Sequence, residues 1–158
     1  QLRVHRAHDL VVGVRAGAAH PDLASADDVR RAVLAAGRVG YSTGPSGTHV
    51  ATLFERWGIV DRLAERVVVA PPGVPLAELL RRGDVDLAFQ QLSELTADGV
   101  DVVGPLPADI QSLTTFSGAV ARTSTHADEA RRVIDFLAGP AGANAKRRHG
   151  MEAPSFRA

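Results

Sequence analysis

Short apolar runs alternate with helical patterns through residues 10–95, and this alternation restricts the fold more than any other feature. Four runs have the composition of buried strands: Leu10–Val14, Val39–Tyr41, Arg66–Ala70 and Asp86–Gln90. Short connections and helical segments separate them, which predicts an α/β domain with a mainly parallel sheet. Ligands bind such sheets at the carboxyl ends of the strands. Two loops have that position, Ser42–Thr48 and Gln90–Glu94.

The pattern changes after residue 100. The remaining segments are an extended stretch, a long strand, a helix with one apolar face and a second, basic helix: Asp101–Leu106, Leu113–Ala121, a helix from Asp128, and Ala141–His149. A Gly-Pro pair at 139 and 140 separates the two helices. The chain contains no internal repeat.

Composition excludes several classes of function. The 158 residues are 45% hydrophobic, enough for the core of one domain or somewhat more. Lys plus Arg and Asp plus Glu are 18 each and aromatic residues are 4%, so nothing favours a nucleic-acid partner. No apolar run approaches the roughly 18 residues of a membrane span. Cysteine is absent and the six histidines lack metal-ligand spacing, so we expect neither metal nor cofactor.

A helix begins within the Ser42–Thr48 loop. Four apolar residues follow at helical spacing: Val50, Leu53, Phe54 and Trp57. Ser46, Gly47 and Thr48 therefore stand where unpaired backbone N–H groups and the positive end of the helix dipole face outward. Such a place binds anions. The alternative is that Ser46 only caps the helix, which is worth about 1 kcal/mol.

Two adjacent amides end the apolar strand that starts at Asp86. Because side chains alternate along a strand, Gln90 and Gln91 should point to opposite faces, one inward and one outward. A glutamine at a strand's carboxyl end, facing a helix N-terminus, offers NH₂ donors to oxygen atoms. The alternative is a hydrogen-bonded polar cap of the sheet edge.

Catalytic motifs are absent. The sequence has no GxSxG elbow and no lysine after Gly47 as in a phosphate-binding loop. The spacing of its acidic residues does not establish a pair of carboxylates for general acid–base catalysis. His49 lies one turn from the predicted anion site, where a solvated histidine is more common than a ligand. We therefore do not expect an enzyme.

Several segments together resemble the periplasmic substrate-binding proteins of ABC transporters, in their molybdate-binding-like branch. They are VVGVRAGAAHPDLAS, RVGYSTGPSGTHVATLFERWGI, GVPLAELLRRGDVDLAFQQLSEL, VDVVGPLPADIQ and DEARRVIDFLAGPAGANAKRRHGME. The resemblance implies the type 2 periplasmic-binding-protein fold, in which two α/β lobes close on a small oxyanion. It implies one complete α/β lobe, residues 26–111, plus the C-terminal part of the other lobe, residues 1–25 and 112–158 with the hinge strands.

The resemblance also implies the position of a binding site. Pro45–Gly47 matches the family's helix-start loop and puts Ser46 at the contacting position. Gln90 and Gln91 stand where molybdate binders usually carry a Val-Tyr pair, so an oxyanion or a small carboxylate is expected rather than molybdate specifically. The predicted ligand-binding residues are Ser42, Ser46, Gly47, Thr48, Gln90 and Gln91.

The implied partners are a small anionic ligand and an ABC-transporter membrane permease, in a periplasmic or other extracytoplasmic location. Two other functions remain open: a ligand-sensing domain of a transcriptional regulator, and a cytosolic enzyme using the same cleft. Complete family members have further N-terminal residues. The strands Leu10–Val14 and Leu113–Ala121, neighbours near the hinge, should therefore have open edges, which predicts either a homodimer through them or an N-terminal segment absent from this chain.

Overall fold

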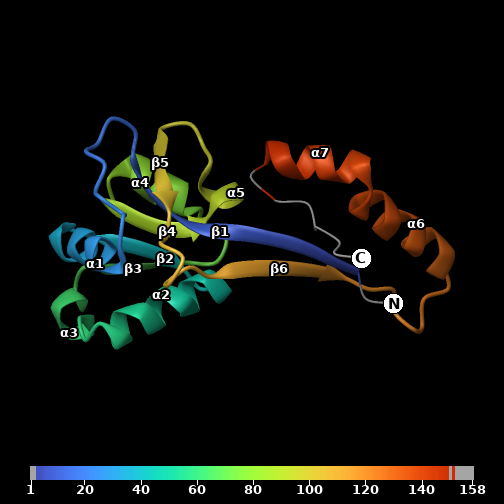
Figure 1. Cartoon of the computed structure of the whole chain (residues 1–158), viewed down its shortest axis with the longest axis horizontal. Coiled ribbons are helices and arrows are strands. Elements are labelled where there is room, and N and C mark those ends of the chain that lie inside the picture. The colour runs from blue at the N-terminus through green and yellow to red at the C-terminus, as the bar shows by residue number, and fades with distance from the viewer. Residues whose placement is uncertain (1–2, 150, 152–158) are drawn as a thin grey trace. The chain divides into compact units, whose positions relative to one another are not determined.

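The computed structural model describes residues 3–149 and residue 151, which form two compact units (Figure 1). The larger unit is Asp9–Leu113, and the other combines the chain's two ends, up to His8 and from Thr114 on. Strand β1 (Arg3–Arg15) contributes residues to both. The expected division into lobes at residues 26 and 111 stays a prediction.

The sheet of the larger unit is mixed, with strand order β3-β2-β4-β1-β5. Besides β1, its strands are β2 (Val39–Ser42), β3 (Val67–Ala70), β4 (Leu87–Gln91) and β5 (Val100–Pro105). β2 runs parallel to β3 and β4, whereas β1 runs antiparallel to β4 and β5. The expectation of a mainly parallel sheet is wrong for β1, which runs opposite to both of its neighbours in this order, because an apolar run indicates that a strand is buried but not its direction.

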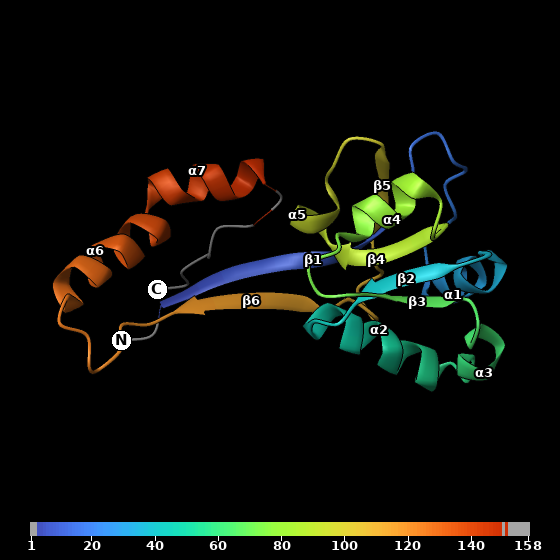
Figure 2. The same ribbon diagram turned by 180° about the vertical axis from the view of Figure 1, so that it is seen from behind.

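Helices cover both faces of this sheet (Figure 2). They are α1 (Ala26–Ala35), α2 (Pro45–Arg56), α3 (Val60–Leu63), α4 (Leu76–Arg82) and α5 (Leu92–Leu95). Val12 and Phe89 belong to one apolar cluster with residues of α1, α2 and α3, whereas Val11 and Ala88 belong to another with α4 and α5. Neighbouring strand residues thus point to opposite faces, as the two-residue period requires.

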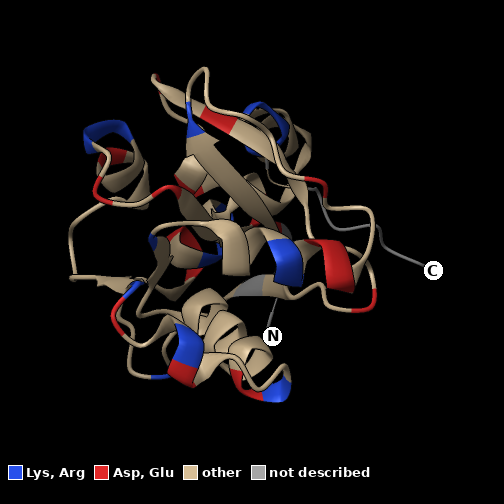
Figure 3. Cartoon of the chain, turned by 90° about the vertical axis from the view of Figure 1, so that its left-hand side faces the viewer, with Lys and Arg blue, Asp and Glu red and all other residues tan. Residues whose placement is uncertain are grey.

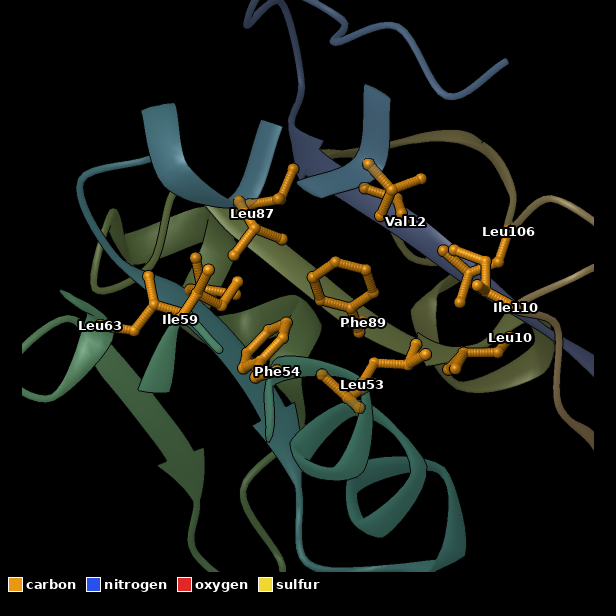
Figure 4. Close-up of a cluster of buried hydrophobic side chains, with 14 of the residues drawn as sticks. Leu10, Val12, Leu53, Phe54, Ile59, Leu63, Leu87, Phe89, Leu106 and Ile110 are labelled. Carbon is orange, nitrogen blue, oxygen red and sulfur yellow. The ribbon is translucent and has the colours of Figure 1, made fainter. Parts of the chain in front are cut away.

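Phe89 lies at the centre of the larger cluster and is 1% exposed (Figure 4). Its ring meets that of Phe54 edge to face, with centroids 6.1 Å apart. Burial of side chains of this size is worth roughly 1.5–3 kcal/mol each, so α2 is held firmly against β4. The position of the helix start relative to the end of β4 follows from this packing.

Strand β1 is central, not open. Leu10, Val11, Val12 and Val14 are at most 3% exposed, and β1 pairs with β4 on one side and β5 on the other. The expectation of an open edge along Leu10–Val14 is therefore wrong, because the chain returns after α5 to place β5 beside it. The strands at the two ends of the order are β3 and β5. In β3, Val69 is 44% exposed, so the expected buried strand Arg66–Ala70 is covered only in part.

The smaller unit contains β6 (Leu113–Gly118), α6 (Ala127–Ala138) and α7 (Pro140–Arg148). β6 pairs with β1, which confirms that these two strands are neighbours, and it ends before the predicted Ala121. No residue of α6 is buried. Val133, Phe136 and Leu137 form an apolar face on it and are 45–64% exposed.

Charged positions of both signs are interspersed over the ribbon in Figure 3, so neither sign dominates the side shown. Within residues 3–149 and 151, no helix combines the length and the apolar character needed to cross a membrane.

Candidate functional site

Strands β2 and β4 are parallel neighbours, so their carboxyl ends meet at one edge of the sheet. Tyr41 pairs with Phe89, which places Ser42 beside Gln90. Helix α2 starts at Pro45, three residues after Ser42. This short connection brings Ser42, Ser46 and Gln90 together.

The side-chain oxygen of Gln90 accepts three hydrogen bonds. Its Oε1 lies 3.1 Å from Ser46 Oγ, 3.3 Å from Ser42 Oγ and 3.3 Å from the backbone N of Gln91. Ser46 is 4% and Gln90 6% exposed. A backbone N–H can only donate, so the atom facing Gln91 N has to be the amide oxygen. This contact fixes the orientation of the amide.

The amide nitrogen of Gln90 consequently faces away from these donors. Among residues 3–149 and 151, no group accepts a hydrogen bond from Gln90 Nε2. Gln90 also lines a cavity of about 420 Å³, together with Ser42 and Thr43. Within the described residues, Arg30 Nε is the only buried side-chain nitrogen or oxygen without a hydrogen-bond partner, so Gln90 Nε2 is open to solvent and can donate to an acceptor in the cavity.

Helix α2 presents free backbone donors beside this amide. Gly44 is the N-cap residue, Pro45 has no N–H, and no side chain caps the helix. Thr48 is the first helix residue whose N–H donates to the preceding turn, to the carbonyl of Gly44 at 3.0 Å. The N–H groups of Ser46 and Gly47 precede it. The alternative role of Ser46 as the helix cap is wrong, because the N-cap residue is Gly44, two residues earlier, and the Ser46 hydroxyl donates to Gln90 instead.

Gly47 allows α2 to start against the end of β2. A Cβ atom at this position would lie 1.5 Å from the backbone oxygen of Ser42, which no side chain can occupy. The glycine is therefore required by the close approach of two backbone segments. This packing requirement explains why a glycine stands at position 47 of the predicted site.

Two other predicted site residues lie apart from the hydroxyl–amide cluster. Thr48 is exposed and its Oγ1 donates to the Gly44 carbonyl at 3.3 Å. Gln91 is 5% exposed and is the N-cap residue of α5. The expectation that one of the two adjacent amides faces outward is wrong, because helices cover both faces of the sheet where β4 ends. Whether either residue contacts a ligand stays a prediction.

The sequence prediction missed one wall of the cavity. Its other lining residues come from the β3–α4 connection and from α5: Ala70, Pro71, Pro72, Gly73, Val74, Pro75, Leu76 and Glu94. The connection follows the carboxyl end of a parallel strand, so the rule that selected the Ser42–Thr48 loop could also have selected it. No lysine, arginine or histidine lines this cavity.

His49 serves the fold. Its Nε2 lies 2.8 Å from the carbonyl oxygen of Ile110, which ties α2 to the segment after β5. No group of three or more histidine, aspartate or glutamate side chains suited to a metal ion occurs within the part of the chain that the structure describes.

A family model for bacterial extracellular solute-binding proteins matches residues 3–152. The chain belongs to this family. Two solved structures share the fold of this solute-binding protein. A substrate binding domain assigned to a molybdenum ABC transporter of Clostridium difficile has a TM-score of 0.74 at 17% identity, over 98% of this chain and 67% of that one. The Azotobacter vinelandii periplasmic molybdate-binding protein has a TM-score of 0.70 at 17% identity, over 98% and 68%. They confirm the predicted periplasmic-binding-protein fold.

A curated relative of this solute-binding protein is an enzyme by name. The chain is 33% identical over 145 residues to an aconitate isomerase from a Pseudomonas species. The match covers 90% of this chain and 55% of the relative, so the chain spans about half the length of that protein.

Proposed function

We propose that this chain binds a small anionic solute as part of an ABC-type transport system, and that the anion lies where β2 and β4 end. The observation that carries the proposal is the amide of Gln90: three donors hold its oxygen, its nitrogen is left to donate elsewhere, and the residue lines the cavity. Such a donor suits an oxygen atom of an anion.

Other groups near Gln90 also favour a negatively charged ligand. The N–H groups of Ser46 and Gly47 stand at the positive end of α2, a helix of 12 residues. Neither residue is among those that line the cavity, so their contribution to an anion there is that of the helix dipole. The Ser42 hydroxyl lines the cavity and donates its hydrogen to Gln90 Oε1, which keeps the amide oriented for the ligand. Neutral donors and a helix dipole stabilise an anion without a positively charged side chain.

The names of the relatives indicate two kinds of anion. Molybdate, named for the Azotobacter structure, is inorganic, whereas aconitate, named for the Pseudomonas enzyme, is a carboxylic acid. We propose a small organic anion or oxyanion as the ligand, a membrane permease as the partner, and a location outside the cytoplasm. The sequence predicted a homodimer through the strands Leu10–Val14 and Leu113–Ala121, but β1 is paired on both sides. We therefore propose the exposed apolar face of α6 as the contact surface of a homodimer instead.

Replacing Gln90 with glutamate tests the site. Gln90→Glu keeps an oxygen for the three donors but turns the cavity-facing nitrogen into a carboxylate oxygen. We expect the affinity for an anion to fall at least about 100-fold, because like charges in contact cost several kcal/mol. Titration calorimetry against molybdate and citrate measures it.

Thr52→Glu is the control for charge. Thr52 lies on the exposed side of α2, and the substitution adds the same negative charge outside the cavity. Its affinity should match that of the wild-type chain. Unchanged binding in Gln90→Glu, with a normal unfolding midpoint, would place the anion elsewhere.

A second function is favoured by the isomerase relative together with Glu94, the carboxyl group that lines the cavity. An isomerase acting on aconitate moves a proton between carbons of one acid. A base removes the proton from one carbon and returns a proton to another, with no net oxidation. We propose Glu94 for that transfer if the chain turns over aconitate.

The pH dependence separates the two functions. The hydroxyl and amide groups of Ser42, Ser46 and Gln90 do not titrate near neutrality. Burial, reinforced by Glu55, raises the pKa of the neighbouring Tyr41 phenol. Affinity for a fully ionised ligand should therefore be nearly flat from about pH 6 to 8. Proton NMR of cis-aconitate with the purified chain checks for turnover, and a bell-shaped rate profile would favour the isomerase.

A further inference from the structure

We infer that the ligand is an organic acid carrying a hydrogen-bond donor, such as a hydroxyl or ammonium group, near its anionic group, and that Glu94 accepts this donor. The inference rests on the proposed function, since it assumes that an anion occupies the cavity beside Gln90. The inference narrows the class of ligand from small anions to organic acids with a donor group. It also makes Glu94 the residue that discriminates among small anions.

The cavity has two chemically different walls. One is polar, from the ends of β2 and β4, and contains Ser42, Thr43 and Gln90. The other is apolar, from the β3–α4 connection, where three prolines line it with Ala70, Val74 and Leu76. Leu76 and Ala70 are themselves 1% and 3% exposed, so this wall is fixed by the core beneath it.

An apolar wall suits a carbon skeleton. A tetrahedral oxyanion presents oxygen in every direction and gains nothing from contact with proline rings. An organic acid can turn its carboxylate to the donors and its carbon atoms to the prolines. The volume of about 420 Å³ also falls within the range of small-organic-molecule sites.

Glu94 is the one charged residue among the described residues that line the cavity. It is exposed and belongs to α5, which begins directly after β4, so the same short segment carries both Gln90 and Glu94. Within the residues that the structure describes, no ion pair or hydrogen bond engages the Glu94 side chain, and no cationic side chain on the cavity wall balances it.

A carboxylate beside an anion site disfavours ligands that present only negative oxygen atoms. It favours ligands that offer a hydroxyl or ammonium hydrogen to it, because a hydrogen bond to a charged group then replaces repulsion. Glu94 therefore selects among anions by rejecting those without a donor.

Matched acids test the inference by titration calorimetry on the full chain. The first set is succinate, malate and aspartate, which differ by a hydrogen, a hydroxyl and an ammonium group at one carbon. The second set is tricarballylate and citrate, and molybdate is included. We expect the hydroxyl or ammonium acid of a set to bind about 10- to 100-fold more tightly than its unsubstituted acid.

Glu94→Ala should remove this preference and should strengthen binding of the unsubstituted acid. Asp98→Ala is the matched control, because Asp98 is exposed like Glu94 and lies four residues along the chain, but is not among the residues that line the cavity. Asp98→Ala should keep the wild-type preference, and both variants should keep the wild-type unfolding midpoint.

The outcomes separate this inference from the proposed function. Equal binding within each set, or the same preference in Glu94→Ala, overturns the role of Glu94 but leaves an anion site. Binding of molybdate without the organic acids overturns the ligand class alone. Binding of none of these anions overturns the proposed function, and this inference with it.

Discussion

Gly47→Ala is expected to destabilise the larger unit by about 3 kcal/mol or more and to abolish anion binding. The added Cβ would lie 1.5 Å from the Ser42 carbonyl oxygen and 2.7 Å from its carbon. Both are backbone atoms, so no side-chain rotation relieves the contact and the start of α2 has to move away from β2. The effect should therefore reach or exceed the upper range for overpacked sites. Urea unfolding and calorimetry with citrate or molybdate measure the two losses.

Gly44→Ala is the matched control in the same loop. A Cβ there would meet nothing closer than Ser42 Oγ at 3.8 Å, and its φ of −78° suits any residue. We expect a change of at most about 1 kcal/mol, as for other N-cap replacements. If Gly47→Ala were as mild as Gly44→Ala, α2 would not begin against β2 as the structure shows.

The sequence predicts the pieces of this site better than their roles. Helical spacing from Val50 to Trp57 predicts the body of α2, and the apolar run before Gln90 predicts β4. Which residue caps a helix depends on where the first turn closes, and pattern alone does not fix that. The sequence therefore left a capping role for Ser46 open as the alternative to ligand binding, and the structure excludes it, because Gly44 is the N-cap residue.

The sequence also does not predict the direction of a strand or which strands it pairs with. The run Leu10–Val14 predicted a buried strand, yet its pairing with β5 depends on a return of the chain some 90 residues later. The cavity beside Glu94 shows the same limit of sequence-based prediction. Its loop was predicted to bind a ligand, but the cavity wall opposite it comes from the β3–α4 connection, and only the fold brings the two together.

Phe89→Ala should cost about 3–5 kcal/mol of stability, a large share of the total for a domain of this size. The Phe89 side chain is 1% exposed and packs edge to face on Phe54 of α2. Removing the ring leaves a cavity between β4 and α2, the two elements that hold Gln90 against Ser46. We therefore expect weaker anion binding in whatever fraction stays folded. Urea unfolding monitored by circular dichroism gives the stability change.

Phe136→Ala makes the same substitution on α6, where the ring is 64% exposed. In a monomer its effect should stay within about 0.5 kcal/mol, as for other surface positions. A larger loss, with an unfolding midpoint that rises with protein concentration, would show that a second copy covers this face. Light scattering on the wild-type chain then distinguishes the proposed homodimer from a monomer.

A cost for Phe89→Ala no greater than that for Phe136→Ala would contradict the central position of Phe89, and with it the packing that sets the geometry of the site.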